Sequence, residues 1–164
     1  MSDIIRNAAR SVLVPVIDRV RYGRDVNGRI PILTERETWD PDRLRRWQTE
    51  QLRDFLVHCR DHIPFYRKRF DDADFDPEDL EDPSQIEVIP PLTKEDIRAH
   101  HGDLFAAGVD RRSLRAGRTG GSTGTPTPFW HSMDEAAWFE ATIRRCWDWI
   151  GVPHGAPMVK MGGG

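Results

Sequence analysis

The sequence has only two cysteines, Cys59 and Cys146, and no long apolar run. A helix that crosses a bilayer needs about 20 apolar residues, but the run from Val12 to Ile17 is short and contains Pro15. Two cysteines cannot build a disulfide scaffold, and these two fit no metal-ligand spacing. We therefore expect a globular protein with reduced core thiols and no transmembrane segment.

The sequence also lacks an excess of charge of one sign. Its 24 basic and 27 acidic side chains leave a net charge of −3 over 164 residues, which is the length of one domain. Binding to a nucleic-acid backbone depends on clustered Lys and Arg, so we expect no nucleic-acid partner. No basic leader, long apolar stretch or small-residue cleavage site marks a signal peptide. We expect a cytoplasmic protein, and nothing in the sequence indicates its oligomeric state.

The N-terminal segment is rich in arginine. Through Arg24 it holds five Arg and two Asp, together with the short apolar run. A helix that packs on the rest of the protein is the simpler interpretation. An amphipathic helix that lies in a membrane interface is the alternative.

Hydrophobic spacing predicts a helix between Asp40 and Phe70, because apolar residues recur there every three or four positions. Asp40 suits the N-cap and Pro41 the first turn. Pro64 is expected to end or kink the helix, since proline disfavours helical geometry in the residue before it. The predicted apolar face comprises Leu44, Trp47, Leu52, Phe55, Leu56 and Cys59.

An acidic segment follows, with eight carboxylates between Asp71 and Asp82. It predicts a solvated loop with one helical turn at residues 77–80. The segment lacks the glycine and the spacing of an EF-hand, so a calcium site is not favoured. Thr93 and Asp96 then match a capped helix start, which predicts a helix over residues 94–105.

The C-terminal part changes character. Residues 113–119 and 127–132 are both suited to extended structure, with a glycine-rich link between them. Ser132 and Glu135 predict a second capped helix, which should end at Gly151. Its predicted apolar face comprises Ala136, Phe139, Ile143, Cys146, Trp147 and Ile150. Residues 157–161 begin like a further strand.

The glycine-rich link carries the chemistry. Residues 119–126 read TGGSTGTP, with three glycines and four hydroxyl side chains. Glycines let backbone N–H groups turn toward one point, and hydroxyls add donors. Such a concavity suits phosphate. The segment matches neither the Walker A pattern nor G-x-G-x-x-G, so a flexible hairpin turn is the alternative.

With two upstream segments, this loop resembles the adenylate-forming enzymes, the superfamily of acyl-CoA synthetases, luciferases and peptide-synthetase adenylation domains. Residues 58–67 (HCRDHIPFYR) and 89–97 (IPPLTKEDI) resemble more specifically the phenylacetate-CoA ligase branch and its relatives associated with capsular polysaccharide synthesis. The resemblance covers about residues 40–164. It implies an α/β fold: an N-terminal helix and linker over residues 1–39, then the first helices and strands of the large adenylate-forming domain, truncated at its C-terminal end.

The resemblance also implies a function. Members activate a small carboxylic acid with ATP and Mg²⁺ as an acyl-adenylate, and the CoA ligases then transfer the acyl group to CoA. The loop is expected to close on the β- and γ-phosphates. The implied nucleotide-binding residues are Thr119, Gly120, Gly121, Ser122, Thr123, Gly124 and Thr125. Many members carry a lysine where this sequence has Thr127, so we expect a lysine there to be tolerated.

The family segments for adenine, ribose and the acyl group, and a C-terminal lid with a catalytic lysine, have no counterpart here. We therefore assign no catalytic residue, leave the acid open, and expect the chain alone to be inactive. A non-catalytic phosphate-binding or protein-interaction module, complete at 164 residues, is the alternative.

Other reactive side chains have simpler interpretations. His58 and His62 are four apart on a predicted helix, but the pattern of a zinc protease is absent, so we assign no metal site. Cys59 falls on the apolar stripe and is expected to be a buried, inert thiol. Trp130 is the tryptophan best placed to line a pocket. The arginines before the loop, expected to face solvent or to raise phosphate affinity, are Arg111, Arg112, Arg115 and Arg118.

Overall fold

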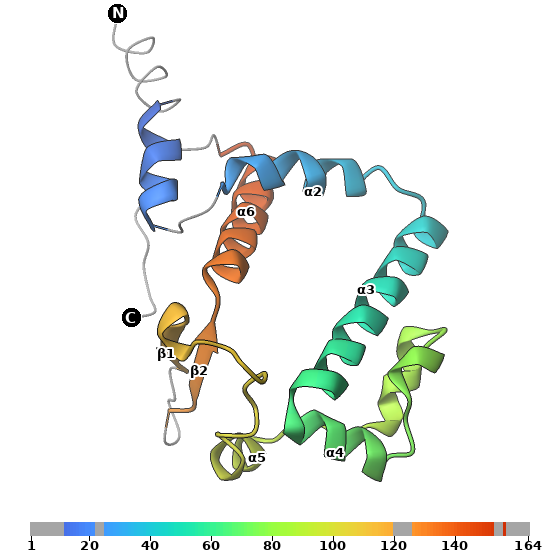
Figure 1. Ribbon diagram of the computed structural model, residues 1–164. Helices are drawn as coiled ribbons and strands as arrows, with labels where there is room; N and C mark the ends of the chain where they lie inside the picture. The colour runs from blue at the N-terminus through green and yellow to red at the C-terminus, as the bar shows by residue number, and fades with distance from the viewer. Residues whose placement is uncertain (1–11, 22–24, 120–125, 153–155, 157–164) are drawn as a thin grey trace, which may run out of the picture. The chain divides into compact units, whose positions relative to one another are not determined.

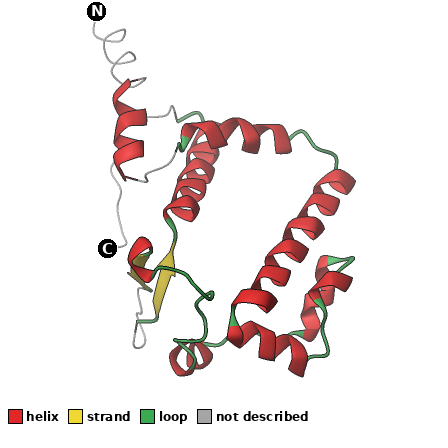
Figure 2. Cartoon of the chain, in the orientation of Figure 1, coloured by secondary structure: helices red, strands yellow, loops and turns green. Residues whose placement is uncertain are grey.

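A computed structural model describes residues 12–21, 25–119, 126–152 and 156 of the chain. Helices dominate the described part, with one pair of short strands (Figures 1 and 2). None of the helices described is long and apolar enough to span a membrane. After a helix over residues 12–21, the elements are η1 (Asn27–Arg29), α2 (Ile30–Arg36), α3 (Pro41–His62), α4 (Pro64–Asp72), η2 (Pro77–Asp79), η3 (Pro83–Val88), α5 (Lys94–Ala99), η4 (Arg111–Ser113), β1 (Arg115–Arg118), β2 (Pro128–His131) and α6 (Met133–Trp149).

The chain divides into two compact units. Unit 2 is continuous and comprises residues 39–111, whereas unit 1 combines residues 1–38 with residues 112–164. A mostly helical chain with a small antiparallel sheet is consistent with part of an α/β protein. The larger adenylate-forming domain, and the boundary predicted at residue 40, stay predictions.

In unit 2, the predicted helix and its interruption are confirmed. The Asp40 carboxylate caps α3 by accepting a hydrogen bond from the backbone N–H of Arg43 at 2.8 Å, and Pro41 occupies the first turn. Helix α3 ends at His62, and α4 starts at Pro64. The proline therefore separates two helices, as expected from its effect on the preceding residue.

The core of unit 2 lies where α3 meets α4 and η2. Its buried members are Leu56, Cys59, Phe70 and Leu80. The predicted apolar face of α3 is partly wrong, because Phe55 is 60% exposed. The buried stripe runs instead through Thr49, Leu56 and Cys59, and Phe55 lies at its edge on the helical projection.

In the segments after α4, the predicted helical turn and helix start are found, but the predicted end of α5 is not. The helical turn η2 and the start of α5 are confirmed: Thr93 and Asp96 exchange hydrogen bonds of 3.0 Å between side chain and backbone N–H. Helix α5 stops at Ala99, so the prediction of helix to residue 105 is wrong. The backbone beyond it bonds to the α3–α4 joint. Phe65 N–H donates to Asp103 O at 3.2 Å, and Ala107 N–H donates to His62 O at 2.7 Å.

In unit 1, both predicted strands and the helix after them are confirmed. Strands β1 and β2 pair antiparallel, with Gly117 opposite Phe129. The Ser132 hydroxyl caps α6 by accepting from Glu135 N–H at 3.0 Å. At the other end, Gly151 has a φ of +74°, and Val152 N–H reaches back to a carbonyl of the last turn. A glycine is favoured in this left-handed helix end. Residues 157–161, the further predicted strand, lie outside the described residues.

The core of unit 1 forms where α6 meets η1 and α2. Val26, Ala137 and Ala141 are its buried members. The predicted apolar face of α6 is partly wrong, since Phe139 is 68% exposed and Ile150 is 73% exposed. Small alanines let the neighbouring elements approach closely, and this contact leaves Phe139 and Ile150 outside the buried stripe.

Candidate functional site

The candidate site begins at the neck of the hairpin that carries the glycine-rich loop. Thr119 N–H donates to Thr127 O at 3.0 Å, and Thr127 N–H donates to the Thr119 hydroxyl at 3.0 Å. The first bond continues the backbone ladder of β1 and β2 by one position, and the second joins the returning backbone to the Thr119 side chain. The chain therefore leaves and returns at one point, and the loop starts from fixed ends.

Thr127 is buried at this neck. Its side chain is 4% exposed, and its Oγ1 atom has no hydrogen-bond partner among the described residues. An unpaired buried hydroxyl costs about 1–3 kcal/mol. The position that carries a lysine in many adenylate-forming enzymes is here a compact side chain in an enclosed place.

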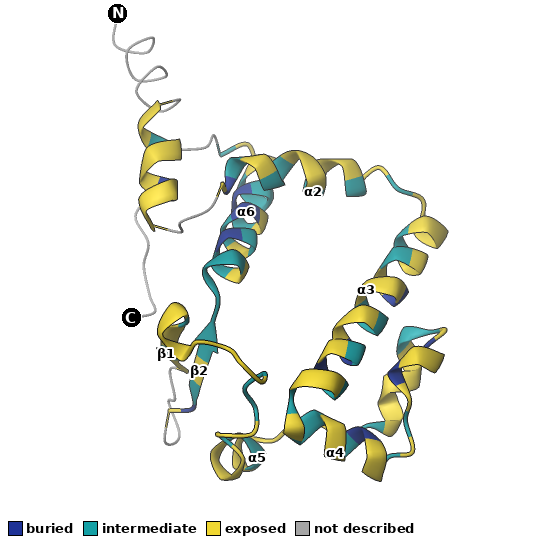
Figure 3. Cartoon of the chain, viewed as in Figure 1, coloured by how far each residue is buried: buried dark blue, intermediate teal, exposed yellow. Residues whose placement is uncertain are grey.

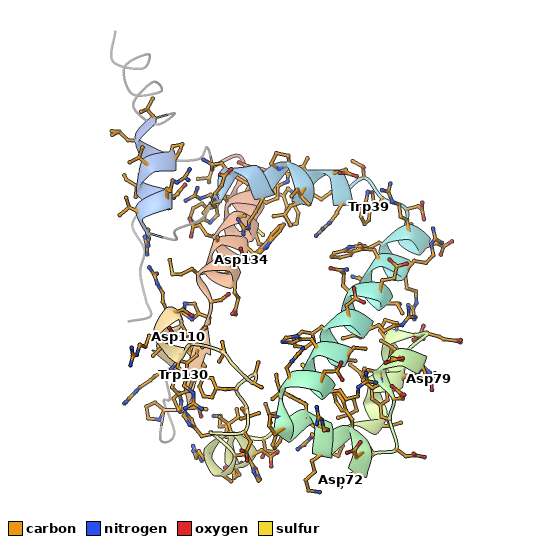
Figure 4. All side chains as sticks on the ribbon, viewed as in Figure 1. Trp39, Asp72, Asp79, Asp110, Trp130 and Asp134 are labelled. Carbon is orange, nitrogen blue, oxygen red and sulfur yellow. The ribbon has the colours of Figure 1, made fainter. Side chains whose placement is uncertain are left out.

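The hairpin has two different faces. On one, the Phe129 ring lies over Gly117, where a Cβ would be 2.5 Å from the ring carbon Cζ, and stacks on His131 with centroids 6.0 Å apart. The glycine is therefore required for this close approach. On the other face lies Trp130, which is labelled in Figure 4. The register places it opposite Ala116. Trp130 is half-buried.

The predicted nucleotide-binding residues are only partly within the described chain. Thr119 is described, and its hydroxyl oxygen accepts the bond at the neck. Residues 120–125 lie outside the described residues, so their role stays a prediction. Sequence reasoning missed that Thr119 and Thr127 form the neck. The signal was available, because antiparallel pairing of the two predicted strands places residues next to the loop opposite each other.

The arginines before the loop have different surroundings. In unit 2, the Arg111 guanidinium lies 3.9 Å from the centroid of the Phe105 ring. In unit 1, Arg115 donates to the backbone carbonyl of Arg21. Arg118 is exposed on the last position of β1, next to the neck. Of these three, Arg118 lies nearest to the loop in the sequence.

The two upstream segments of the resemblance build unit 2. Arg69, just beyond the first segment, donates to the carbonyls of Pro90 at 2.9 Å and Pro91 at 2.6 Å, in the second. It also lies 3.5 Å from Asp96. The pKa of Asp96 lies below its ordinary value. The main cause is the hydrogen bond from the backbone N–H of Thr93, and the second is the hydrogen bond with the Thr93 side chain. These segments therefore have a structural role in joining α4 to the start of α5.

The other reactive groups considered in unit 2 are two histidines and one cysteine. The rings of His58 and His62 are 4.6 Å apart. Across the described part of the chain, no group of three His, Cys, Asp or Glu side chains is placed to hold a metal ion. Cys59 is 1% exposed, and burial raises the pKa of its thiol. The prediction of a buried core thiol is confirmed.

Comparison with known proteins identifies relatives but no family model matches the chain. The phenylacetate-coenzyme A ligase of Escherichia coli (strain K12) is 32% identical over 100 residues, which are 60% of this chain and 23% of that protein. The Thermus thermophilus ligase of the same name is 31% identical over 113 residues, or 68% of this chain and 25% of the relative. The Pseudomonas putida ligase of the same name is 31% identical over 104 residues, which are 63% of this chain and 24% of that protein.

The matched region spans about a quarter of the length of these relatives. Their shared name agrees with the resemblance drawn from residues 58–67, 89–97 and 119–126. Four relatives of one name match at 27–32% identity. The chain is therefore related in sequence to the phenylacetate-coenzyme A ligases.

Proposed function

We propose that this chain contributes the phosphate-binding hairpin of an acid–CoA ligase, acting within a larger adenylate-forming domain. The observation that carries the proposal is the match to the phenylacetate-CoA ligases over about 60% of the chain. The closed neck of the hairpin supports it, because a loop with fixed ends can aim its N–H groups at one ligand. The substrate class is a small carboxylic acid, with ATP and CoA as co-substrates.

The proposed reaction has two steps. A carboxylate oxygen of the acid bonds to the α-phosphorus of ATP, the bond between that phosphorus and the bridging oxygen breaks, and pyrophosphate leaves. The CoA thiol then attacks the acyl carbon, loses its proton and releases AMP. Magnesium, when bound to the phosphates, neutralises part of their charge.

The residues of this chain would act on the leaving group. Donors at Ser122, Thr123 and Thr125 would hold the β- and γ-phosphates, and the Thr119–Thr127 neck would hold the loop. Donors that strengthen as charge develops raise turnover more than binding. Arg118, exposed at the end of β1, would add a positive charge.

The test is acid-dependent exchange of pyrophosphate into ATP by the whole protein encoded by the gene, with phenylacetate and a panel of other small acids. Removing one donor of this kind costs about 10²–10³ in rate, so Thr123→Ala should lower kcat toward that range with a smaller change in KM for ATP. Gly121→Val should be worse, because a β-branched residue resists positive φ. Ser84→Ala, in unit 2, is the control.

Two results would overturn the proposal. Near wild-type exchange by both loop variants would leave the segment a simple hairpin turn. A stop codon directly after Gly164, with no exchange for any acid but retained binding of inorganic pyrophosphate, would favour a non-catalytic phosphate-binding module.

A further inference from the structure

The helix over residues 12–21 exposes most of its apolar side chains. Figure 3 shows it mostly in the colour for exposed residues, at the blue end of the chain in Figure 1. Five of its apolar residues are 55–82% exposed: Val12, Leu13, Val16, Ile17 and Val20. At about 100° per residue, the five fall within an arc of about 140°. The helix therefore presents one continuous apolar face to solvent.

The helix is held by its polar face. Asp18 is 4% exposed and accepts two hydrogen bonds of 2.6 Å from the guanidinium of Arg144 on α6. On the helical projection, Asp18 lies opposite the centre of the apolar arc. The ion pair thus fixes which side of the helix faces the rest of unit 1, and the apolar side of the helix faces outward.

The exposed side carries positive charge. Arg19 and Arg21, both exposed, border the apolar arc on its two sides. The charge of Asp18, the one acidic residue between positions 12 and 21, is compensated by Arg144. Arg115 adds a further cation at the end of the helix, where it donates to the backbone carbonyl of Arg21. The outward surface is therefore apolar at its centre and cationic at its edges.

From this arrangement we propose that the helix over residues 12–21 binds the surface of an anionic lipid bilayer. Its apolar arc enters the boundary between headgroups and acyl chains, and its arginines contact lipid phosphates or carboxylates. An amphipathic helix with cations beside an apolar face is suited to this interface. Charge complementarity selects an anionic surface.

A second copy of the chain fits this face less well. A two-fold contact is self-complementary, so each apolar arc would bring its bordering arginines toward those of the other copy. Like charges brought together oppose association.

The experiment is co-sedimentation of the 164-residue chain with lipid vesicles. We expect binding to phosphatidylcholine vesicles that contain about one third phosphatidylserine to be about tenfold tighter than binding to pure phosphatidylcholine, and to weaken as salt is raised. The double variant Val16→Glu, Val20→Glu should lose at least about tenfold in binding. Phe139→Glu, which places one such carboxylate on an exposed position of α6, is the control and should bind like the wild type.

A second variant separates folding from binding. Arg19→Gln leaves the apolar arc intact and should lower binding to the phosphatidylserine vesicles by about fivefold, without changing binding to phosphatidylcholine. Equal binding by wild type and the Val16→Glu, Val20→Glu variant would overturn the proposal. So would sedimentation-velocity evidence that the arc joins two copies and leaves the vesicles unbound.

Discussion

Asp18 and Arg144 form a bidentate ion pair between positions 126 residues apart in the sequence. Both side chains are buried, and the guanidinium also donates to Glu140 at 2.9 Å and to Asn27 at 3.2 Å. Burial acts to lower the pKa of Arg144, but the hydrogen bonds and charges of Asp18 and Glu140 outweigh it and raise the pKa. The guanidinium therefore stays charged, and the pair joins the helix over residues 12–21 to α6.

We predict that breaking this pair from one side destabilises unit 1. Arg144→Met leaves the Asp18 carboxylate buried without the guanidinium, and Asp18→Leu leaves the buried guanidinium with Glu140 and Asn27 alone. Removing one partner of a buried pair costs about 3–5 kcal/mol. Urea unfolding followed by tryptophan fluorescence measures the loss.

The double variant is the sharper test. Asp18→Leu with Arg144→Met removes both charges, so it should lose less free energy of unfolding than either single change. Arg98→Met, at the exposed pair with Glu95, is the control and should cost less than about 1 kcal/mol. Additive losses in the double variant would mean that the two charges do not act as a pair.

Stability should depend on pH through the helix caps. The backbone N–H of Arg43 holds the pKa of Asp40 below its ordinary 3.8. A carboxyl with a lowered pKa in the folded state stabilises the fold above its unfolded pKa, and this contribution is lost as pH falls through the folded pKa. We expect the free energy of unfolding to fall below about pH 4.

Asp40→Asn tests the assignment, because asparagine caps a helix about as well as aspartate and does not titrate. The variant should show a shallower loss of stability in acid, measured by urea unfolding at a series of pH values. Glu87→Gln, at an exposed carboxyl outside any helix start, is the control. An unchanged acid slope in Asp40→Asn would contradict the prediction.

Thr127 provides a prediction that differs from the one drawn from sequence alone. Because its hydroxyl is buried without a partner among the described residues, Thr127→Val should leave stability unchanged or raise it by up to about 1 kcal/mol. Thr127→Lys should lower it by at least about 2 kcal/mol, since the ammonium enters an enclosed position. Equal thermal unfolding of the lysine variant and the wild type would restore the expectation that a lysine is tolerated.

Gly117 should resist substitution because of Phe129. A Cβ at position 117 would displace the aromatic ring, so Gly117→Ala should cost about 1 kcal/mol. In the background of Phe129→Ala the same change should cost little. Gly102→Ala, where a Cβ meets no atom within 4 Å, is the control. A double-mutant cycle by chemical denaturation measures the coupling, and independence of the two sites would contradict the contact.

The two thiols should differ in reactivity. Cys59 is buried with a raised pKa, whereas Cys146 is partly exposed. Since the thiolate is the reactive form, a disulfide reagent should modify Cys146 faster in the folded chain. The variants Cys59→Ser and Cys146→Ser assign the two phases, and in denaturant both thiols should react alike. Faster reaction of Cys59 in the native state would place it outside the core.

Local signals predicted the helix starts well, because capping depends on a few neighbouring residues. Asp40, Thr93 and Ser132 all cap the helices expected of them. The buried faces were predicted less well, since periodicity does not tell which of two apolar stripes meets a neighbour. On α6 the selected stripe includes Arg144, a residue that a hydrophobic pattern excludes.

The candidate site was predictable only in part, for a related reason. The glycine-rich composition of residues 119–126 pointed to the loop, and the extended segments on each side predicted the hairpin. The burial of Thr127 depends on packing around the hairpin, which no local pattern reports. The end of α5 was missed because Asp103 and Ala107 bond to residues some forty positions earlier.

The continuity of unit 2 sets an order for folding during synthesis. Residues 39–111 emerge from the ribosome as one stretch, and their contacts close shorter loops than the Asp18–Arg144 pair does. Such contacts form quickly, because little chain entropy is lost in closing them. Unit 1 completes its packing later, because Asp18 can pair with Arg144 only after residue 144 has been synthesised. Until then the helix over residues 12–21 is a nascent segment whose carboxylate lacks its guanidinium partner, and its apolar side chains are open to chaperones.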